Sequence, residues 1–581
     1  MKYRFLSIIF VCTIVLALVP WLAATVGNHG QLRVPPEFTD DSVYYYTRIH
    51  SVAEGYPFIG NPYFKEHRND MATAFFGADW IASAPLLLHI PLIPAIMVDT
   101  VIGFALFAGL IILLCQALGI RTWGTALSLS ATLACTYWFL ERPVSMQIVF
   151  PIFLFFLLSY LWWLRYPELY KTRLALIASA VLSFYTYTYL WQIVVIIMGI
   201  THIVFLIRER SRLVSLLILD GIVVILAFPL FWYTYLQLHQ QWYWQTMLRT
   251  GLVATHSFGG AAVIAAVLSM FIGVAMWTLR DDYQARRTDI EFFFIVGVSI
   301  LIAVFSNVIT GKDLESANHF IRFTYVWAAL AGSYVVYRHV ESQGYDWRAY
   351  ARANRFTIIL LALVIFFSFN AYQTLRGFHF VASPGTLAPQ TYTAPLQWLN
   401  DNTPTGSVIF ADDEFSYYIP LMTHDYVLFQ PDGGLYLVSD REVQDRYLTS
   451  RMFARLSLSD IERDARLYAG VGNAIDTYKT LNRTTEVCRL FIHTALGCPP
   501  LLNTVSYLGV PYFSDMFNRY QDTILAQPEN ALSSFGVTYI IKDTSLDETM
   551  HPEKLSGSSL VATIGRFEIY TLSATGTLAH S

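Results

Sequence analysis

Long apolar runs alternate with short polar segments over the first two thirds of the chain. A helix needs about 20 consecutive apolar residues to cross a bilayer, and many of the runs approach that length with few charges. The pattern predicts eleven spanning helices, near residues 5–27, 98–118, 123–140, 144–164, 173–189, 190–207, 213–232, 260–279, 290–309, 321–338 and 356–376. The chain is therefore predicted to be a polytopic α-helical membrane protein.

One apolar segment departs from this pattern. Residues 81–97 read IASAPLLLHIPLIPAIM and carry Pro85, Pro91 and Pro94. Proline interrupts the hydrogen bonding of a helix interior. This segment is therefore expected to be an interfacial or re-entrant piece that leads into the second span.

The pattern changes after residue 376. Short apolar runs of the kind that form strands, SVIFA, YVLFQ, VTYIIKD and LVATIGRFEIYTL, are separated by turn residues and by a mostly helical stretch at 440–530. The sequence thus divides into a transmembrane domain, 1–376, and an α/β domain, 377–581. Asp412, Asp413 and Glu414 in FADDEFSYYIP follow a strand directly, so they are expected to form a turn or a helix cap, with a second acidic site as the alternative.

Positive charge predicts the orientation. Cytoplasmic loops of membrane proteins carry the excess of Lys and Arg. One set of alternate loops is the richer in these residues: Lys2 and Arg4; Arg121; Arg165, Lys171 and Arg173; Arg208, Arg210 and Arg212; Arg280, Arg286 and Arg287; Arg338, Arg348, Arg352 and Arg355. We therefore expect a multi-pass protein of the inner or plasma membrane with a cytoplasmic N-terminus. The loop 28–80 and the C-terminal domain are then extracytoplasmic.

Composition narrows the classes of partner. Only 14% of the residues are charged, against about 25% in soluble domains, and the net charge of -4 argues against nucleic acid. The predicted cytoplasmic loops are short and contain no glycine-rich phosphate loop, so a cytoplasmic nucleotide-sugar site is not expected. The membrane itself is the predicted environment of any substrate.

The cysteines add one expectation. Cys12, Cys115 and Cys135 lie in apolar spans, where small buried side chains are common. Cys488 and Cys498 lie in the C-terminal domain, and an oxidising compartment would allow a disulfide between them. The Cys and His residues show no zinc-site spacing, and no residue is assigned as a metal ligand.

The candidate chemistry lies in TDDSVYYYTRIH, residues 39–50. Asp40 or Asp41, just outside the first span, could take a proton from an acceptor as general base, or could orient an acceptor or a divalent cation. A solvated acidic turn is the alternative. The aromatic surroundings favour a site, and Tyr44, Tyr45, Arg48 and His50 are then predicted to bind substrate.

At these residues the chain resembles the C-type glycosyltransferases (GT-C), integral membrane enzymes that use polyprenyl-phosphate-linked sugars. The stretch from Asp41 to Arg48 is similar to the acid, aromatics and arginine of oligosaccharyltransferase catalytic subunits, and the pair Asp40–Asp41 to the acids of arabinosyl- and protein mannosyltransferases. The resemblance implies inverting transfer of a sugar to a glycan, lipid or protein acceptor, with Asp40 or Asp41 as base.

Two features depart from that family. The Trp-Trp-Asp acceptor motif of oligosaccharyltransferases is absent from 377–581. The loop LERPVSMQ offers Glu141 as a substrate-binding candidate but lacks the second acidic motif that helps to hold a metal there. These departures weaken the case for transfer to asparagine and for metal dependence. No cofactor is assigned, although the acids leave room for a divalent cation.

Arginines near the outer ends of the spans are candidates for the donor phosphate, because Arg binds phosphate through charge-assisted bidentate hydrogen bonds. Arg322 in ESANHFIRF is the first candidate, with His319 beside it, and Arg249 in MLRTGLVATH is another. Arg142 is read mainly as an ordinary loop arginine. Interfacial anchoring is the alternative for all of them.

Two other functions remain open. A transporter or flippase for lipid-linked saccharides would carry ionisable residues near the bilayer midplane and paired halves with broken helices. Asp220 is the one acid well inside an apolar run, and it lies towards the predicted cytoplasmic end. A non-catalytic protein of envelope assembly is the third possibility. The sugar and the acceptor are not specified by the sequence.

Overall fold

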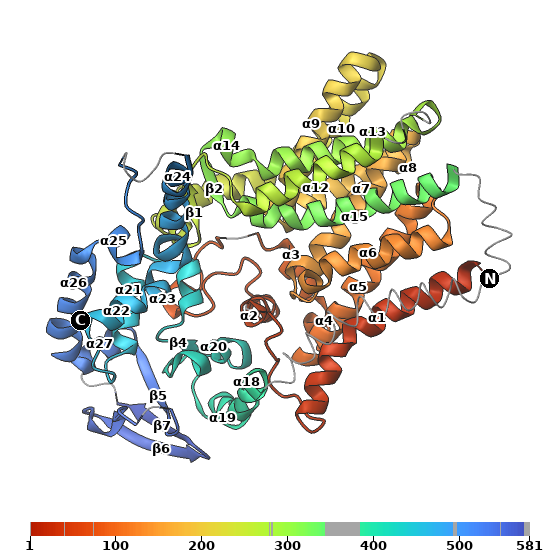
Figure 1. The fold of residues 1–581 in the computed structure, drawn as a ribbon. Coiled ribbons are helices and arrows are strands. Elements are labelled where there is room, and N and C mark those ends of the chain that lie inside the picture. Colours follow the sequence, from red (N-terminus) through yellow and green to blue (C-terminus); the bar gives the residue numbers. More distant parts are fainter. Residues whose placement is uncertain are drawn as a thin grey trace.

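The computed structural model describes residues 2–39, 41–73, 75–277, 279, 283–342, 384–491, 497–546 and 548–573. Figure 1 shows two parts, a bundle of long helices and a mixed α/β domain at one end of it. The N-terminus lies at the far end of the bundle from that domain. The described residues thus form two spatial parts.

Ten of the eleven predicted spans correspond to helices. Six helices are long and apolar enough to cross a membrane, namely α1 (Lys2–Gly27, from Leu6), α5 (Leu92–Ala117), α7 (Ser145–Arg165), α9 (Thr188–Arg208), α10 (Arg210–Leu238) and α12 (Gly260–Trp277). The other four are α6 (Thr122–Leu140), α8 (Tyr170–Thr186), α13 (Tyr283–Val304) and α15 (Ser316–Ser342). The eleventh predicted span, 356–376, lies outside the described residues.

Helix α7 forms the centre of the bundle. The apolar window of α7 is 83% buried, whereas that of α10 is 28% buried and that of α12 is 11% buried. The outer helices therefore present apolar side chains outward, as lipid contact requires. Residues Phe153, Leu157 and Trp163 of α7 pack in the core of the bundle.

Short elements cover the end of the bundle that faces the α/β domain. The first loop contains α2 (Ser42–Ala53), η1 (Lys65–His67), α3 (Gly77–Ala82) and α4 (Ala84–Leu87). The later loops contribute α11 (Tyr243–Arg249), β1 (Leu252–Ala254), α14 (Ser306–Thr310) and β2 (Lys312–Leu314), and β1 pairs with β2 in antiparallel register.

Residues 81–97, predicted to form an interfacial or re-entrant piece, are divided between the end of α3, α4 and the first turns of α5. Helix α4 ends at Leu87, and α5 already begins at Leu92. Pro91 is the N-cap of α5 and Pro94 lies in its first turn, where the missing N–H of a proline has no helical partner to lose. The prolines therefore start the second span rather than set a re-entrant piece apart from it.

The C-terminal domain has the predicted strands. They are β3 (Val408–Phe410), β4 (Tyr426–Val427), β5 (Val537–Asp543), β6 (Ser558–Ile564) and β7 (Phe567–Leu572). The sheet order is β4-β3-β5-β7-β6, with β3 parallel to β4 and β5, and β7 antiparallel to β5 and β6. Parallel pairing of β3 with β5 requires a long crossover, and the helical stretch between them supplies it.

Helices fill the rest of this domain. Those before and beside β3 are α18 (Pro384–Leu387), η3 (Ala388–Tyr392), α19 (Thr393–Asn402) and α20 (Asp413–Met422). The crossover contains η4 (Pro431–Leu435), α21 (Asp440–Ser450), α22 (Leu458–Arg463), α23 (Ala465–Val471), η5 (Gly472–Asp476), α24 (Thr477–Phe491), α25 (Thr504–Leu508), α26 (Val510–Arg519), η7 (Tyr520–Leu525) and α27 (Pro528–Ser534), and η8 (Pro552–Lys554) precedes β6.

Two local predictions in this domain are confirmed. Asp412 caps α20, because its carboxylate accepts hydrogen bonds from the backbone N–H groups of Glu414 and Phe415. Cys488 and Cys498 form a disulfide. A disulfide fits the predicted extracytoplasmic position of the domain.

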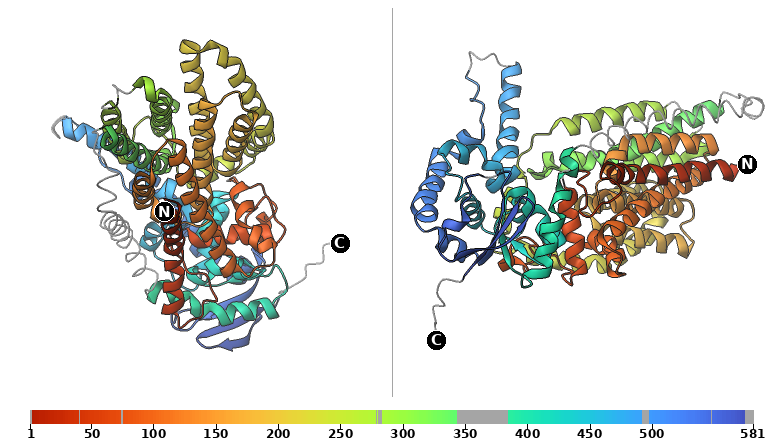
Figure 2. Two further views of the ribbon diagram at one scale, coloured as in Figure 1. Left: turned by 90° about the vertical axis from the view of Figure 1, so that its right-hand side faces the viewer. Right: turned by 90° about the horizontal axis from the view of Figure 1, so that it is seen from below.

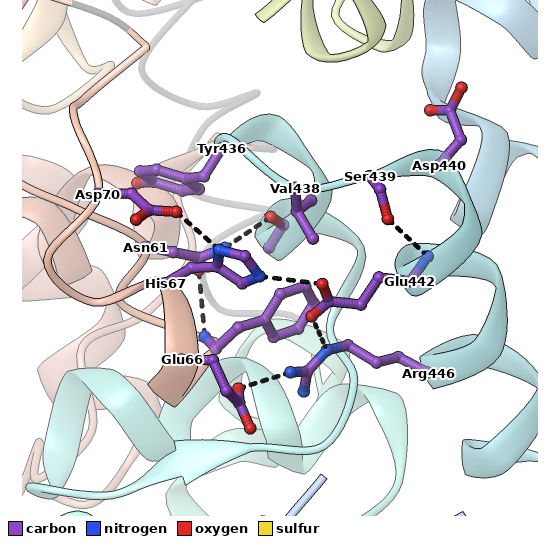
Figure 3. Close-up of polar contacts among 12 residues, drawn as sticks. Asn61, Glu66, His67, Asp70, Tyr436, Val438, Ser439, Asp440, Glu442 and Arg446 are labelled. Atoms are coloured by element: carbon purple, nitrogen blue, oxygen red, sulfur yellow. Dashed lines mark hydrogen bonds and ion pairs between the residues drawn. The ribbon is translucent and has the colours of Figure 1, made fainter. Parts of the chain in front are cut away.

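The first loop is joined to the C-terminal domain through a cluster of polar contacts, shown in Figure 3. The Asn61 side chain donates to the Gly433 carbonyl at 2.9 Å. His67 bridges Asp70 at 2.7 Å and Glu442 at 3.0 Å. Long-range contacts of this kind hold a surface loop in one conformation.

The buried guanidinium of Arg446 completes this junction. It binds Glu66 at 2.6 Å and Glu442 at 2.9 Å. The Phe64 and Phe535 rings lie 4.2 Å and 4.5 Å from its central carbon. An arginine that combines ion pairs with aromatic stacking is a well-satisfied buried charge.

Gly433 and Gly434 provide a test of this junction. A Cβ at Gly433 would lie 2.4 Å from the buried Phe64 ring, whereas a Cβ at Gly434 would meet Val443 at an ordinary 3.6 Å. We expect Gly433→Ala to destabilise the protein by about 1–3 kcal/mol, a typical penalty of overpacking. Thermal unfolding in detergent measures the effect, and Gly434→Ala is the matched control. Equal melting curves for the two variants would contradict this junction.

Candidate active site

A cavity of about 330 Å³ lies where the first loop, the ends of the long helices and the C-terminal domain meet. Figure 2 shows the first loop, in red to orange, between the bundle and that domain. The cavity is lined by Asp41, Tyr44, Tyr45, Arg48, Thr73, Phe75, Ala78, Asp79, Arg142, Val144, Ser145, Thr186, Tyr187, Thr188, Tyr189, Met247, Thr250, Leu314, His319, Asp432 and Leu435.

Helix α2 brings the predicted residues together. Asp41 is its N-cap, and Asp41, Tyr44, Tyr45 and Arg48 all line the cavity. Their spacing of three, four and seven residues places them on one helical face. His50 is off this face and lies 3.9 Å from Glu54, away from the cavity. Asp40 lies outside the described residues.

Arg48 is held in place by an acid that the sequence did not single out. Its guanidinium binds both carboxylate oxygens of Asp79 at 2.9 Å and 2.7 Å. It also donates to the Tyr44 hydroxyl at 3.2 Å and to the Phe75 carbonyl at 3.1 Å. The two charged side chains are 2% and 3% exposed. Such a bidentate buried pair fixes the geometry of the cavity wall.

Arg142 lines the cavity, although the sequence favours an ordinary loop arginine at this position. Its guanidinium forms an ion pair with Asp41 and lies 5.2 Å from the centre of the Tyr45 ring. The side chain is 18% exposed. The Asp41 carboxylate is thus directed at the second loop of the predicted outer face, between α6 and α7.

The backbone beside Arg142 is strained. Val144 has φ 57° and ψ -61°, and the Ser145 N–H donates to the Pro143 carbonyl at 2.5 Å. This is the geometry of a γ-turn that is rare for a residue with a branched side chain. Val144 and Ser145 line the cavity next to Arg142. Strained backbone of this kind is characteristic of functional sites.

His319, predicted as a donor-phosphate residue, also lines the cavity. Its ring stacks on Tyr189 with centroids 4.1 Å apart, and its Nδ1 lies 2.6 Å from the Tyr187 hydroxyl. Its Nε2 lies 3.6 Å from Glu315. The hydrogen bond to His319, together with the charges of Arg322 and Arg142, lowers the pKa of Glu315 although burial opposes this shift.

Arg322 lies one turn beyond His319 on α15, just outside the cavity lining. Its central carbon is 5.3 Å from the centre of the Phe139 ring. Its Nε and Nη1 are buried and make no hydrogen bond in the described part of the chain. Arg322 is the only described arginine with two such nitrogens. Buried donors without a partner are costly unless a ligand satisfies them.

Two other predicted residues lie apart from this cavity. Arg249 is buried and donates to Gly434 at 2.9 Å and to Val438 at 2.7 Å, and it pairs with Asp440. Those contacts join α11 to the C-terminal domain. Glu141 is buried at the end of α6, burial raises its pKa to about 7, and its Oε1 has no hydrogen-bond partner within the described ranges. Neither residue lines the cavity of Asp41.

The C-terminal domain supplies an acid that sequence reasoning missed. Asp432, in η4, lines the cavity together with Asp41. It lies in the turn QPDGGLY directly after the predicted strand YVLFQ. An acid on a loop after a strand is a weak signal for a site, and only the docking of the two domains brings it to Asp41.

No metal centre emerges from the side chains. Within the described ranges, no group of three or more His, Cys, Asp or Glu side chains is placed to hold a metal ion. The chemistry that the cavity itself offers is that of carboxylates, arginines, a histidine and tyrosine hydroxyls.

No family model matches the chain, and no curated protein matches its sequence. Solved structures are similar to it at low identity. ArnT from Cupriavidus metallidurans in the apo state is 11% identical, with a TM-score of 0.47 over 96% of this chain and 97% of that chain.

A second similar structure is the Archaeoglobus fulgidus oligosaccharyltransferase tethered to an acceptor peptide that contains the NVT sequon. It is 12% identical, with a TM-score of 0.44 over 94% of this chain and 70% of that chain. The oligosaccharyltransferase AglB from the same organism, in complex with an inhibitory peptide and a dolichol-phosphate, is 13% identical with a TM-score of 0.36. Sequence identities and TM-scores as low as these assign no activity to this chain.

The Arg48–Asp79 pair can be tested by removing one charge. Asp79→Asn would leave the Arg48 guanidinium buried without its counter-charge. We expect a loss of about 3–5 kcal/mol of stability, the usual cost of breaking a buried ion pair. Asp515→Asn is the control, because Asp515 is 60% exposed in its ion pair and such pairs contribute about 0–1 kcal/mol. Chemical or thermal unfolding that ranks the variants in the opposite order would contradict this role.

Proposed function

We propose that the protein transfers a sugar from a polyprenyl-phosphate donor to an acceptor at the extracytoplasmic face of the membrane. The observation that carries this proposal is the cavity that joins Asp41 to Arg142 at the end of the helical bundle. It combines an acid that could accept a proton with cations that could hold a phosphate. These are the two requirements of sugar transfer from a lipid phosphate.

The arginine side of the cavity is the proposed site for the donor phosphate. The charges of Arg142 and Arg322 both act on Glu315, and Glu315 lies 3.6 Å from the His319 ring. Two buried nitrogens of Arg322 have no hydrogen-bond partner among the described residues, and an anionic ligand would satisfy them with charge-assisted hydrogen bonds. The pKa of Glu315 stays low, so its carboxylate orients these cations rather than serving as an acid.

Asp41 is the proposed general base. In the reaction, the acceptor oxygen or nitrogen forms a bond to the anomeric carbon while the bond from that carbon to the phosphate oxygen breaks. The phosphate keeps the electron pair, and the acceptor proton passes to Asp41. Tyr44 and Tyr45, on the same face of α2, provide aromatic surfaces of the kind on which sugar rings pack.

The location of the cavity supports a donor that arrives from the membrane. Its walls come from the loops and ends of long apolar helices, so a lipid phosphate among those helices would have its head group at this level. The proposed topology has a cytoplasmic N-terminus and an extracytoplasmic domain after residue 376. The acceptor then comes from the side of the C-terminal domain and is a glycan, a lipid or a protein.

Replacing Asp41 tests the proposed base. We expect Asp41→Asn to lower the rate of sugar transfer by about 10²–10⁴-fold, the usual contribution of a general base. Purified protein in liposomes would be given undecaprenyl-phosphate-linked glucose, mannose or arabinose with envelope extract as acceptor. The exposed Asp401→Asn is the control. Transfer that survives the Asp41 change at the wild-type rate would rule out this base.

Replacing Arg322 tests the proposed phosphate site separately from catalysis. We expect Arg322→Gln to weaken the binding of undecaprenyl phosphate by about 10- to 100-fold, because hydrogen bonds to a charged group contribute about 1.5–3 kcal/mol. Quenching of tryptophan fluorescence on titration measures the affinity. Lys312→Gln, an exposed cation of the same end of the bundle, is the control. Equal affinities for wild type and Arg322→Gln would refute the phosphate site.

A further inference from the structure

Asp432 lies at the meeting point of two cavities. It lines the cavity of Asp41, and it also lines a second cavity of about 300 Å³ within the junction of α11 with the C-terminal domain. Leu435 is the other residue common to both linings. The second cavity extends to Arg466, which is exposed. The carboxyl group of Asp432 thus lies on a route from the candidate active site towards the outside.

The position of Asp432 is fixed by contacts on both sides of its turn. The Gln430 side chain accepts a hydrogen bond from the Asp432 N–H at 2.5 Å, and Asn61 donates to the next carbonyl, that of Gly433, at 2.9 Å. Thr73 donates to the Leu435 carbonyl at 2.8 Å. Both Asn61 and Thr73 belong to the first loop, which also carries Asp41. The loop therefore sets the position of Asp432 relative to Asp41.

Burial and the charge of Asp41 favour the protonated form of Asp432. The charge of Asp41 acts on it, and the Tyr417 hydroxyl of α20 donates a hydrogen bond to it. Its charge in turn acts on Tyr44 of α2 and Tyr63 of the first loop. The cations of the second cavity are Arg249, which is paired with Asp440, and Arg466 at the exposed end. Burial, followed by the charge of Asp41, raises the pKa of Asp432 to about 7 although Tyr417 opposes this shift.

We propose that Asp432 is a second carboxyl group of the proposed active site, whose negative charge raises the affinity of Asp41 for the proton released by the acceptor. This inference rests on the proposed function. Asp41 and Asp432 line the same cavity, and the negative charge of each one disfavours the ionised form of the other. A proton that arrives from the acceptor relieves this repulsion. The C-terminal domain is then part of the catalytic centre.

The path of the acceptor proton in the proposed transfer step can be followed from start to end. Above about pH 7, where Asp432 is ionised, the two carboxylates carry two negative charges when the acceptor binds. The acceptor proton moves to Asp41 as the new glycosidic bond forms and the sugar–phosphate bond breaks, so the two carboxyl groups then carry one negative charge. The proton then passes from Asp41 to water. No oxidant, reductant or further reactant is needed.

The first experiment does not depend on catalysis. Infrared difference spectra of the detergent-solubilised protein, recorded on acidification from about pH 8 to pH 5, detect carboxyl groups that become protonated near neutral pH. We expect Asp432→Asn to remove one such band. We expect Asp41→Asn to shift the same band to lower pH by about one unit, because a neighbouring negative charge has been removed. A band that is absent, or that Asp41→Asn leaves unchanged, overturns the pairing.

The second experiment follows sugar transfer against pH, with the undecaprenyl-phosphate sugars named above. The wild-type rate is expected to fall as pH decreases through about 7, because protonation removes the ionised pair. In Asp432→Asn the rate is expected to be about 10- to 100-fold lower, and this acidic decline is expected to move to lower pH. Asp412→Asn is the matched control, since Asp412 is also a partly buried acid of this domain, its pKa is raised by burial, and Asn still caps a helix.

The outcomes separate the two proposals. If the transfer rate of Asp432→Asn falls with decreasing pH at the same pH as in wild type, the proposed role of Asp432 is overturned. This holds whether the rate of the variant is normal or reduced, because the loss of a purely structural role would not move the pH profile. The same shift in Asp412→Asn also overturns it. Wild-type protein that fails to transfer any of the sugars contradicts the proposed function instead, while the infrared result still decides whether Asp41 and Asp432 interact.

Discussion

The candidate site depends on the docking of the first loop against the C-terminal domain around Arg446. A buried guanidinium is expensive to desolvate unless its donors are satisfied. Here Glu66 of the loop and Glu442 of the domain share it, between the rings of Phe64 and Phe535. Since neither part alone satisfies this charge, the arrangement of the two is specific. It places η4, and with it Asp432, against the cavity of Asp41.

The arginines of the site fall into two physical classes. Arg48 is saturated by Asp79, Tyr44 and Phe75, and its role is to hold the wall. Arg322 retains two buried N–H groups without a partner in the described structure. Keeping such donors aligned before the ligand arrives reduces the reorganisation needed during binding. The difference between the two classes is the main physical reason to place an anion at Arg322 rather than at Arg48.

Local sequence patterns predicted the helices and strands of this protein better than the residues of its candidate site. Apolar runs and charge gave ten helices and all five strands of the domain, because these depend on periodicity over short segments. The spacing of Asp41, Tyr44, Tyr45 and Arg48 already implies one helical face, and the same rule would have excluded His50. The sequence also offers Arg249 as a phosphate candidate after Arg322, and its contacts with Gly434 and Asp440 show that it joins the two domains instead. Asp432 reaches Asp41 by domain docking, which local patterns do not record.

The charges in the cavity are ordered in a way that couples the two halves of the proposed reaction. The cations Arg142 and Arg322 act on Glu315, and Asp41 is paired with Arg142 and acts on Asp432. When Asp41 receives the acceptor proton it loses its charge, and the ion pair with Arg142 loses its attraction. Arg142 is then available to the phosphate, which gains negative charge in the same step. Proton transfer on the acceptor side would thus strengthen the stabilisation of the leaving group on the donor side.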